Sequence, residues 1–464
     1  MTEPDPASLS FIPLGGSGAF GMNCNLYATE DRILMVDCGV SFLRVVGGDN
    51  QITMPDPAWI ARRREKLVGL VLTHGHEDHI GAVAAMWPQL RCPIFATPFT
   101  AHLLRGRLAS AGLASVVQLI EVPAGGRAKV GPFRLRFIGM THSIAEAQSV
   151  VIETKHGKVL HTGDWKLDPD PRIGPVTDEA ALRSLAKSGL LAAVSDSTNA
   201  TRPGWSTSEA AVEARLTERI AAAEGMVVTA CFASNVARIQ SLCRAADAAG
   251  RSVVVLGRSL HRMINAARAT GYLDDLPSLV PLRHAGYLPR EATLLLCTGT
   301  QGEPMAALAR LAMGRFRDIR LTPGDTALFS SKIIPGNELP IEWLHRALTE
   351  QGVTVIHEQD DPGIHASGHP CQDELATLYG WTKPSMVIPV HGTHRHLEAH
   401  CALARQLGIP SVKIENGVIL RLAPGAATIV GRVQVGEVLR PDVEKDEHFA
   451  AAVKAEIERS PTSK

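Results

Sequence analysis

The sequence predicts an α/β protein in which a sandwich of two packed sheets is interrupted by an inserted α/β domain. The first two hundred residues form a series of short strand patterns, which favours two packed sheets over a doubly wound unit. From about Gly189 strand and helix patterns alternate, as they do around a parallel sheet. A chain of 464 residues also exceeds one ordinary hydrophobic core, so more than one domain is expected.

The individual elements follow from hydrophobic periodicity and from the turn residues between them. In the first part we expect strands over residues 10–14, 24–29, 32–37, 67–73, 93–96, 118–122, 133–138, 149–154 and 158–161, and a helix over 99–111. In the alternating part we expect strands over 190–195, 226–230, 252–256, 293–297 and 326–330, and helices near 206, 236, 260, 304–313 and 339–351. The predicted domains are 1–200 and 356–440 for the sandwich, 201–355 for the insertion and 441–464 for a charged tail.

Local signals define two of these elements more closely. The helix near 206 follows Ser206-Thr207-Ser208-Glu209, which has the spacing of a capping box with Ser206 as the N-cap. Gly16-x-Gly18-x-x-Gly21 after the first strand matches a dinucleotide-binding fingerprint in letters. The fingerprint requires a helix next, whereas a strand pattern follows here. We therefore expect a tight hairpin beside the histidine-rich loop described next.

The strand at 67–73 leads directly into His74-Gly75-His76-Glu77-Asp78-His79, which holds three histidines and a carboxylate within six residues. A bound divalent cation relieves the crowding of such groups. Side chains alternate along extended backbone, so His74 and His76 point to one side and hold one metal. Asp78 and His79 follow the turn and reach a second metal. The run predicts a binuclear metal site rather than the histidines of a surface loop.

Residues at other strand ends complete this predicted site. His142 supplies a third histidine for the first metal, and Asp164 supplies a carboxylate that bridges both. His391 ends an apolar strand before a helix and is the candidate last ligand for the second metal. Asp37 is expected to brace the histidine loop by hydrogen bonds, and His161 to pack behind the ligands.

The strand ends of the alternating part carry groups that suit a phosphate. Asp196, Gly299-Thr300-Gln301-Gly302 and Ser330-Ser331-Lys332 stand where α/β sheets bind ligands. Hydroxyls suit phosphate oxygens and Lys332 adds charge, although ordinary turns remain the alternative at each place. His365 and His369 flank Ser367-Gly368 on a loop, where they bind a phosphate or protonate a leaving oxygen. The nearby His394, His396 and His400 are expected on the surface of a helix.

Composition restricts the class of protein. Apolar residues make up 45% and charged residues 20%, the proportions of a soluble globular chain. Lys+Arg and Asp+Glu both number 47, which argues against tight non-specific binding to nucleic acid but allows a positive groove. Eight scattered cysteines without a CxxC pair, and no signal peptide, predict a reduced protein of the cytoplasm. No apolar stretch is long enough for a bilayer, so no membrane partner is expected.

Together these motifs resemble a known family. The histidine run, His142, Asp164 and His391 resemble the metallo-β-lactamase fold, an αββα sandwich, and Asp196, His369 and His391 resemble the signature positions of its β-CASP nuclease branch. Stretches 196–199, 232–235, 257–259, 299–306, 335–338 and 365–369 resemble ribonuclease J in particular. The resemblance runs in order from about Phe11 to Leu439.

The resemblance implies a zinc-dependent ribonuclease of RNA processing and decay. The implied activity is 5′-to-3′ exonuclease action that favours 5′-monophosphate ends, together with endonuclease action. Two Zn²⁺ per chain are implied, with Mn²⁺ or Mg²⁺ as alternatives: His74, His76 and His142 bind one ion, Asp78, His79 and His391 the other, and Asp164 bridges them. Catalytic roles are implied for Asp78, Asp196 and His369, and a phosphate pocket for His365, Ala366, Ser367, Gly368 and His369, beside Ser330, Ser331 and Lys332.

Single-stranded RNA is therefore the expected partner, and other functions were weighed against it. The insertion, Asp196 and His369 speak against a hydrolase of small thioesters or lactones, because small substrates need no such lid. The ribonuclease J-like stretches weigh against a DNA-directed β-CASP nuclease, and the full ligand set against a non-catalytic scaffold. The chain stops soon after the returning sandwich portion, so we expect the family's usual C-terminal domain to be absent, which leaves both a monomer and a homodimer open.

Overall fold

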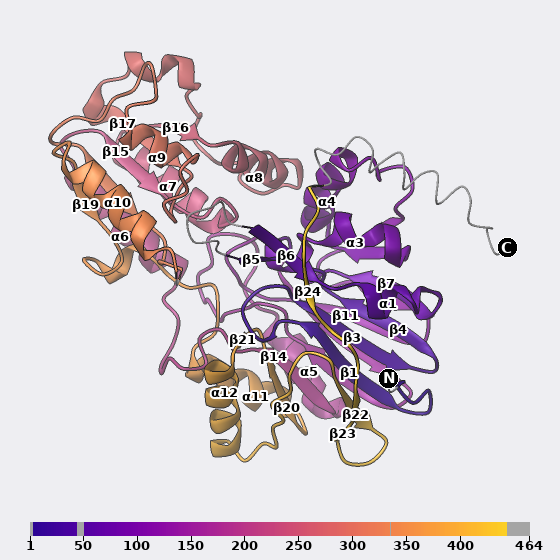
Figure 1. Cartoon of the computed structure of the whole chain (residues 1–464). Helices are drawn as coiled ribbons and strands as arrows, with labels where there is room; N and C mark the ends of the chain where they lie inside the picture. Colours follow the sequence, from indigo (N-terminus) through magenta and orange to yellow (C-terminus); the bar gives the residue numbers. More distant parts are fainter. Residues whose placement is uncertain (1–2, 44–50, 335, 443–464) are drawn as a thin grey trace.

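A computed structural model describes residues 3–43, 51–334 and 336–442 of the chain (Figure 1). Two large sheets form a sandwich, and a third sheet forms the insertion at the upper left of the view. The αββα sandwich with an inserted α/β domain is the predicted fold class, which is confirmed. Residues 443–464 of the predicted tail lie outside the described residues.

The first sheet has eight strands in the order β23-β22-β1-β3-β4-β7-β8-β9. Their bounds are β1 Leu9–Gly15, β3 Cys24–Thr29, β4 Arg32–Val36, β7 Leu67–Val71, β8 Ile94–Ala96, β9 Leu119–Glu121, β22 Val418–Ala423 and β23 Thr428–Arg432. The pairs from β4 to β9 are parallel and the others antiparallel. Because β4 and β7 are parallel neighbours, Asp37 after one lies beside the histidine loop after the other.

The second sheet has six strands in the order β10-β11-β12-β13-β14-β20. Their bounds are β10 Arg127–Val130, β11 Phe133–Gly139, β12 Gln148–Thr154, β13 Gly157–His161, β14 Ala192–Asp196 and β20 Val387–Val390. The strands β13, β14 and β20 run parallel, so the segments after all three emerge at one edge. Asp164 and His391 follow β13 and β20 at this edge, and Asp196 is the last residue of β14.

Alternation along the strands explains the four layers. In β4, Leu34 and Val36 face the second sheet, where Phe137 and Ile152 belong to the same core cluster. Their neighbours Ile33 and Met35 face the helices on the outer side. The helices around the sandwich are α1 Ala58–Ala61, α2 Glu77–Ile80, α3 Val83–Leu90, α4 Pro98–Ser110, α5 Glu179–Ser188, α11 Gln372–Thr382 and α12 His394–Gln406. Of these, α5, α11 and α12 cover the outer face of the second sheet.

The insertion is built on a five-stranded parallel sheet in the order β16-β17-β15-β18-β19. The strands are β15 Val227–Ala230, β16 Ser252–Leu256, β17 Thr293–Cys297, β18 Thr326–Phe329 and β19 Thr354–Ile356. The helices are α6 Glu209–Ala222, α7 Val236–Ala248, α8 Arg258–Ala269, α9 Ala307–Ala312 and α10 Glu338–Thr349. Helices cover both faces, because α6 and α7 share one core cluster with the sheet while α9 and α10 share another. Across the gap between the bodies, α8 contacts α4 (Figure 1).

Both bodies also contain short elements. They are β2 Ser17–Gly18, β5 Ser41–Leu43, β6 Gln51–Pro55, β21 Gly392–Thr393, β24 Glu437–Leu439, and the 3₁₀ turns Arg64–Lys66, Leu282–Tyr287, Arg290–Ala292 and Pro362–Ile364. The glycine-rich loop after β1 contributes β2, which pairs with β21 directly after His391. It leads into the antiparallel strand β3, so the predicted hairpin beside the histidine loop is confirmed.

The predicted capping box at the start of α6 is wrong. The N-cap is Ser208, whose side chain accepts a hydrogen bond from the backbone N–H of Ala211. Ser206 instead donates both its N–H and its hydroxyl to Glu374 in α11, at 2.8 Å each. Ser206 therefore bonds to a carboxylate that is distant in the sequence and does not cap α6, as its local spacing predicted.

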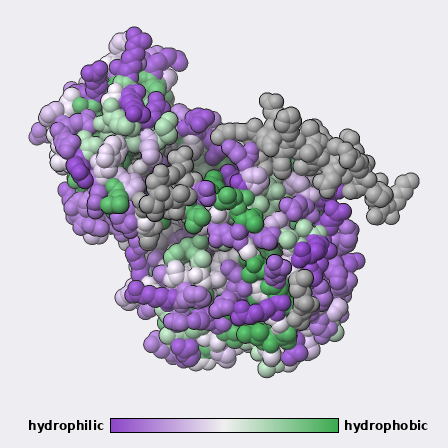
Figure 2. Space-filling model, viewed as in Figure 1, coloured by the Kyte–Doolittle hydropathy of each residue, from purple (hydrophilic) through white to green (hydrophobic). Residues whose placement is uncertain are grey.

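The face in Figure 2 is mainly hydrophilic, and its apolar residues gather in small groups. No helix in the described part of the chain combines the length and the apolar character that a bilayer span requires.

Candidate metal centre

The histidine loop leaves β7 and enters the sandwich edge at once. His74 is fully buried, and its Nε2 lies 3.0 Å from Nδ1 of His76. His142, after β11, brings its own Nε2 to 3.1 Å from the same atom of His76. Ligand atoms of these three histidines and of Asp164 all lie within 4.8 Å of one another. The structure thus brings together the residues predicted for the first metal.

A second group adjoins the first through Asp164. His79 Nε2 lies 3.2 Å from Oδ2 of Asp164, and His391 Nδ1 lies 3.0 Å from its Oδ1. His391 Nε2 is also 3.2 Å from Oδ2 of Asp78. Ligand atoms of these four residues again lie within 4.8 Å of one another. The carboxylate of Asp164 belongs to both groups, which is the position that a bridging ligand requires.

The structure adds a third group that the sequence analysis had not assembled. Asp164 and His391 share it with Asp196 and His369, all within the same 4.8 Å limit. His369 Nδ1 lies 2.7 Å from Oδ2 of Asp196, and Thr198 donates to the other oxygen of that carboxylate. The two residues predicted to act on substrate therefore border the predicted ligands directly.

Hydrogen bonds from behind fix the ring orientations. The carbonyl of Gly368 only accepts, so the Nδ1 of His142 at 2.6 Å is its donor, and Nε2 is left to face the cluster. Asp37 accepts from the N–H and hydroxyl of Thr73 and lies 2.8 Å from Nδ1 of His79. That carboxylate turns Nε2 of His79 inward in the same way. The bracing role predicted for Asp37 is confirmed.

The electrostatics differ between the two groups of predicted ligands. Burial and the neighbouring His79 hold the pKa of His74 well below its usual value, and burial lowers the pKa of His76 to about 4. At the second group burial acts to lower the pKa of His79 and of His391, yet Asp164 raises both well above the usual value, so a metal ion there displaces a proton from each ring. Burial acts to raise the pKa of Asp164, yet His391 and His79 hold it well below the usual range. Neutral imidazole nitrogens and ionised carboxylates are the forms that bind metal.

The donor set fits divalent cations on a further ground. The Nε2 atoms of His74 and His142 converge on Nδ1 of His76, at 3.0 Å and 3.1 Å, and the Nε2 of His142 presents a lone pair because its Nδ1 donates to Gly368. Buried ring nitrogens that point at one another in this way are costly unless a ligand satisfies them. The arrangement of five histidines, one shared carboxylate and flanking acids therefore fits metal ions better than a purely structural polar cluster.

The predicted phosphate loop lies beside this centre. The hydroxyl of Ser367 accepts from Nδ2 of Asn199 at 2.8 Å, and the same amide donates to the carbonyl of His369. His365 lies 3.3 Å from Nη1 of Arg238, and burial together with that guanidinium holds the pKa of His365 well below its usual value. Ala366 is buried in the hydrophobic core and can offer only its backbone.

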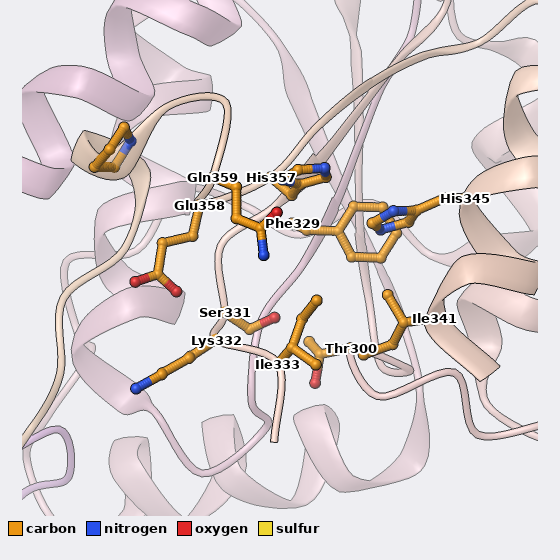
Figure 3. Close-up of a pocket in the computed structure, with 11 residues that line it drawn as sticks. Thr300, Phe329, Ser331, Lys332, Ile333, Ile341, His345, His357, Glu358 and Gln359 are labelled. Atoms are coloured by element: carbon orange, nitrogen blue, oxygen red, sulfur yellow. The ribbon is translucent and has the colours of Figure 1, made fainter. Parts of the chain in front are cut away.

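Ser330, Ser331 and Lys332 take different places. The hydroxyl of Ser330 is buried, donates to the carbonyl of Ile364 at 2.7 Å and accepts from Arg238 at 2.6 Å. We therefore correct the prediction of direct substrate contact for Ser330 to a supporting role, because both partners of its hydroxyl lie within the protein. Ser331 and Lys332 line a cavity of about 290 Å³ (Figure 3).

Several contributors escaped the sequence analysis. Asn23, after the glycine-rich loop, lies 3.1 Å from Nε2 of His79 through its amide. Arg238 carries no local signal, since it lies within the periodic pattern of α7. The surface position expected for His400 is wrong: it is fully buried, with Nδ1 2.9 Å from the hydroxyl of Ser197 and Nε2 bonded to Tyr379. His394 is exposed, as expected, and His396 is half-buried.

Three segments match known families. Residues 17–198 match the metallo-beta-lactamase superfamily. Residues 224–347 match the family described as "Ribonuclease J, beta-CASP domain". Residues 363–414 match the family described as "Zn-dependent metallo-hydrolase RNA specificity domain".

Individual relatives extend over most of the chain. Ribonuclease J of Sinorhizobium meliloti is 43% identical over 437 residues, which cover 93% of this chain and 77% of the relative. Ribonuclease J of Mycolicibacterium smegmatis is 40% identical, over 93% of this chain and 78% of its own length. A crystal structure of an Enterococcus faecalis protein of unknown function superimposes with a TM-score of 0.62 at 14% identity, over 89% of this chain and all of the other, a likeness of fold alone.

Proposed function

This chain belongs to the ribonuclease J family, and on that premise we propose that it is a metal-dependent ribonuclease that degrades RNA from 5′-monophosphorylated ends in the 5′-to-3′ direction. Internal cleavage is its second proposed activity. The observation that carries the proposal is the Asp196–His369 pair, whose atoms lie within 4.8 Å of those of Asp164 and His391. An acid beside a metal cluster suits phosphodiester hydrolysis, because the leaving oxygen needs both charge and a proton.

Two Zn²⁺ ions are the proposed cofactors, with Mn²⁺ or Mg²⁺ as alternatives. His74, His76 and His142 would hold one ion, and Asp78, His79 and His391 the other, with Asp164 shared. The imidazole-rich donor set favours zinc over the oxygen-preferring magnesium. When bound, the ions supply Lewis acidity at the phosphate under attack.

His369 is the proposed proton donor to the departing 3′ oxygen. Its Nδ1 is engaged by Asp196 at 2.7 Å, so Nε2 is the nitrogen available to substrate. Its side chain is 21% exposed, which allows a strand to reach it. Burial opposes the proton, but the carboxylates of Asp196 and Asp164 raise the pKa of His369 above its usual value. A histidine that keeps its proton near neutral pH is suited to act as a general acid.

The loop from His365 to His369 is the proposed phosphate site. Its serine hydroxyl is already oriented by Asn199, and burial together with the charges of Arg238 and Lys332 holds the pKa of His365 well below its usual value. Positive charge behind a short loop with a free donor suits a dianionic terminal phosphate. We propose that this loop reads the 5′-monophosphate end.

The test gives metal-loaded protein three substrates: 3′-labelled RNA with a 5′-monophosphate, the same RNA with a 5′-triphosphate, and matched DNA. We expect rapid loss of nucleotides from the monophosphorylated RNA, slower loss from the triphosphorylated RNA, and none from DNA. The variant His76→Ala should abolish cleavage and keep the fold, because it removes one ligand at a loop. The exposed His284→Ala in the insertion is the matched control and should cleave as wild type does.

Each other outcome removes a named part of the proposal. Full activity of His76→Ala at equal metal content would remove the site assignment. Equal rates on the 5′-monophosphorylated and the 5′-triphosphorylated RNA would contradict the proposal that the loop recognises the 5′-monophosphate. Turnover of DNA alone, or of a small thioester with no cleavage of RNA, would remove the proposed function.

We also propose a cytoplasmic location. All eight cysteines are free and buried, which supports a compartment that keeps thiols reduced. Recovery of the chain from the periplasmic or secreted fraction of fractionated cells would contradict this.

A further inference from the structure

A cavity of about 290 Å³ lies at the carboxyl ends of the parallel strands of the insertion, which is where α/β sheets bind ligands. Figure 3 shows Phe329, His345 and Ile341 at one end and Lys332 and Glu358 at the other. None of these side chains belongs to the predicted metal groups. The cavity therefore combines an aromatic end with a charged mouth outside the metal centre.

The aromatic end is a cluster of three flat rings, two of which are stacked. The rings of Phe329 and His345 lie 4.5 Å apart and nearly perpendicular, and those of His345 and His357 lie 5.1 Å apart at 7°. Nε2 of His345 and Nδ1 of His357 are buried and have no hydrogen-bond partner among the described residues. Burial lowers the pKa of His345 to about 4, so its ring is neutral near pH 7. Flat rings that each carry an unused nitrogen suit a planar heterocycle with hydrogen-bonding edges.

The wall opposite His357 is held by the loop after β17. Gln301 donates to the carbonyl of Lys332 at 2.9 Å and accepts from the N–H of Ile334 at 2.9 Å. These bonds fix the segment that carries Ser331 and Lys332 along the cavity. The stretch 299–302, which the metal chemistry does not use, thereby acquires a role in shaping this wall.

The cavity adjoins the proposed phosphate loop through two connections. Ser330, next to Ser331, donates to the carbonyl of Ile364, directly before His365. Pro362 lines the cavity, and His365 follows it three positions later in the chain, a span of at most about 10 Å. A strand whose phosphate lies at the loop therefore reaches the cavity with a neighbouring base.

We propose that this cavity binds one nucleobase of the RNA strand, stacked against the ring of His357, which His345 supports from behind, with Lys332 at the adjoining phosphate. Bases of single-stranded RNA are commonly held in this way, splayed out and stacked on aromatic side chains, histidine included. The inference rests on the proposed ribonuclease function, and it assigns that activity a base-binding subsite in the insertion.

The test combines an RNA that lacks one base with a variant that lacks the ring of His357. Zinc-loaded enzyme receives 5′-monophosphorylated RNAs in which a single abasic site is moved through successive positions, and single-turnover rates give the half-saturating enzyme concentration. With wild type, one position should raise that concentration about tenfold, the scale of one lost base stack. His357→Ala should raise it about tenfold for intact RNA, with no further rise when that same base is absent. The maximal rate should not change.

Two variants keep the test independent of folding. His357→Phe retains a flat ring and should restore most of the affinity. His284→Ala removes an exposed histidine of the insertion near β16, at the opposite edge of the sheet, and should leave every RNA unchanged. A general loss of fold in His357→Ala would appear as a lower maximal rate on all RNAs, and the His357→Phe measurement would then decide.

The outcomes separate this inference from the function beneath it. If the loss of affinity caused by His357→Ala adds to the loss caused by the abasic site at every position, the two groups do not contact each other. That result would refute the base-binding subsite and leave the proposed ribonuclease function intact. If free adenosine monophosphate binds tightly and does not compete with RNA, the cavity binds a free nucleotide. That result would refute the proposal that it binds a base of the RNA strand. No cleavage of RNA by wild type would remove both proposals.

Discussion

The substitution Asp37→Asn tests how the centre is held from behind. Asp37 is fully buried and has a left-handed backbone with φ of 61°, a conformation that asparagine tolerates. The carboxylate accepts at 2.8 Å and 2.9 Å from Thr73 and lies 2.8 Å from Nδ1 of His79. Asparagine keeps the shape and one acceptor oxygen, so the change is confined to hydrogen bonding and to the loss of one negative charge.

The magnitude follows from the tautomer of His79. If the amide oxygen stays with the N–H of Thr73, the amide NH₂ points at Nδ1 of His79. That ring must then move its proton to Nε2, the atom 3.2 Å from Asp164 that is needed as a metal ligand. Losing such a supporting bond lowers metal affinity by about 10- to 100-fold, or about 1.4 to 2.8 kcal/mol.

The assay is a zinc titration against a fluorescent chelator, with a thermal melt of the same sample. We expect the ion held by Asp78, His79 and His391 to weaken by that factor, while the ion at His74, His76 and His142 changes little. Asp178→Asn is the matched control, because Asp178 caps α5 and asparagine caps equally well. Unchanged binding of both ions by Asp37→Asn would refute the bracing argument, and equal weakening of both would show general damage instead.

Two further substitutions test the supports of the phosphate loop. Arg238→Met removes the guanidinium that lies 3.1 Å from the buried carboxylate of Glu209. Lys166 remains 3.9 Å from that carboxylate, so we expect the free energy of unfolding, measured with denaturant, to fall by about 3 kcal/mol. The double variant Arg238→Met/Glu209→Met should lose clearly less, and an equal loss would show that the ion pair is not the cause. Gly368→Ala places a methyl group 2.7 Å from Cε1 of His142, so bound metal and cleavage should both fall, whereas Gly380→Ala in α11 meets open space and should gain about 0.5–1 kcal/mol in stability. Wild-type metal content in Gly368→Ala would contradict the tight contact.

The sequence alone predicted the features that depend on neighbouring residues. Short strand-like segments bounded by turn residues predicted β3 over Cys24–Thr29 and β16 over Ser252–Leu256 with their observed bounds. The run from His74 to His79 predicted a metal site, because six adjacent residues carry most of the candidate ligands. The setting of Asp37 at a strand end was enough to predict its bracing role, because parallel neighbours end at one edge of a sheet.

Only the tertiary structure decided contacts between residues far apart in the chain. Ser206 lost its predicted capping role to Glu374, and His400 became buried because Ser197 and Tyr379 from other elements surround it. Arg238 joins Glu209, Ser330 and Ile364, which no periodicity connects. Local patterns report backbone geometry and which face is apolar, whereas the partner of a buried polar group is set by how the elements pack. The sequence therefore predicted the candidate metal ligands, which the structure brings together, and packing alone decided what surrounds them.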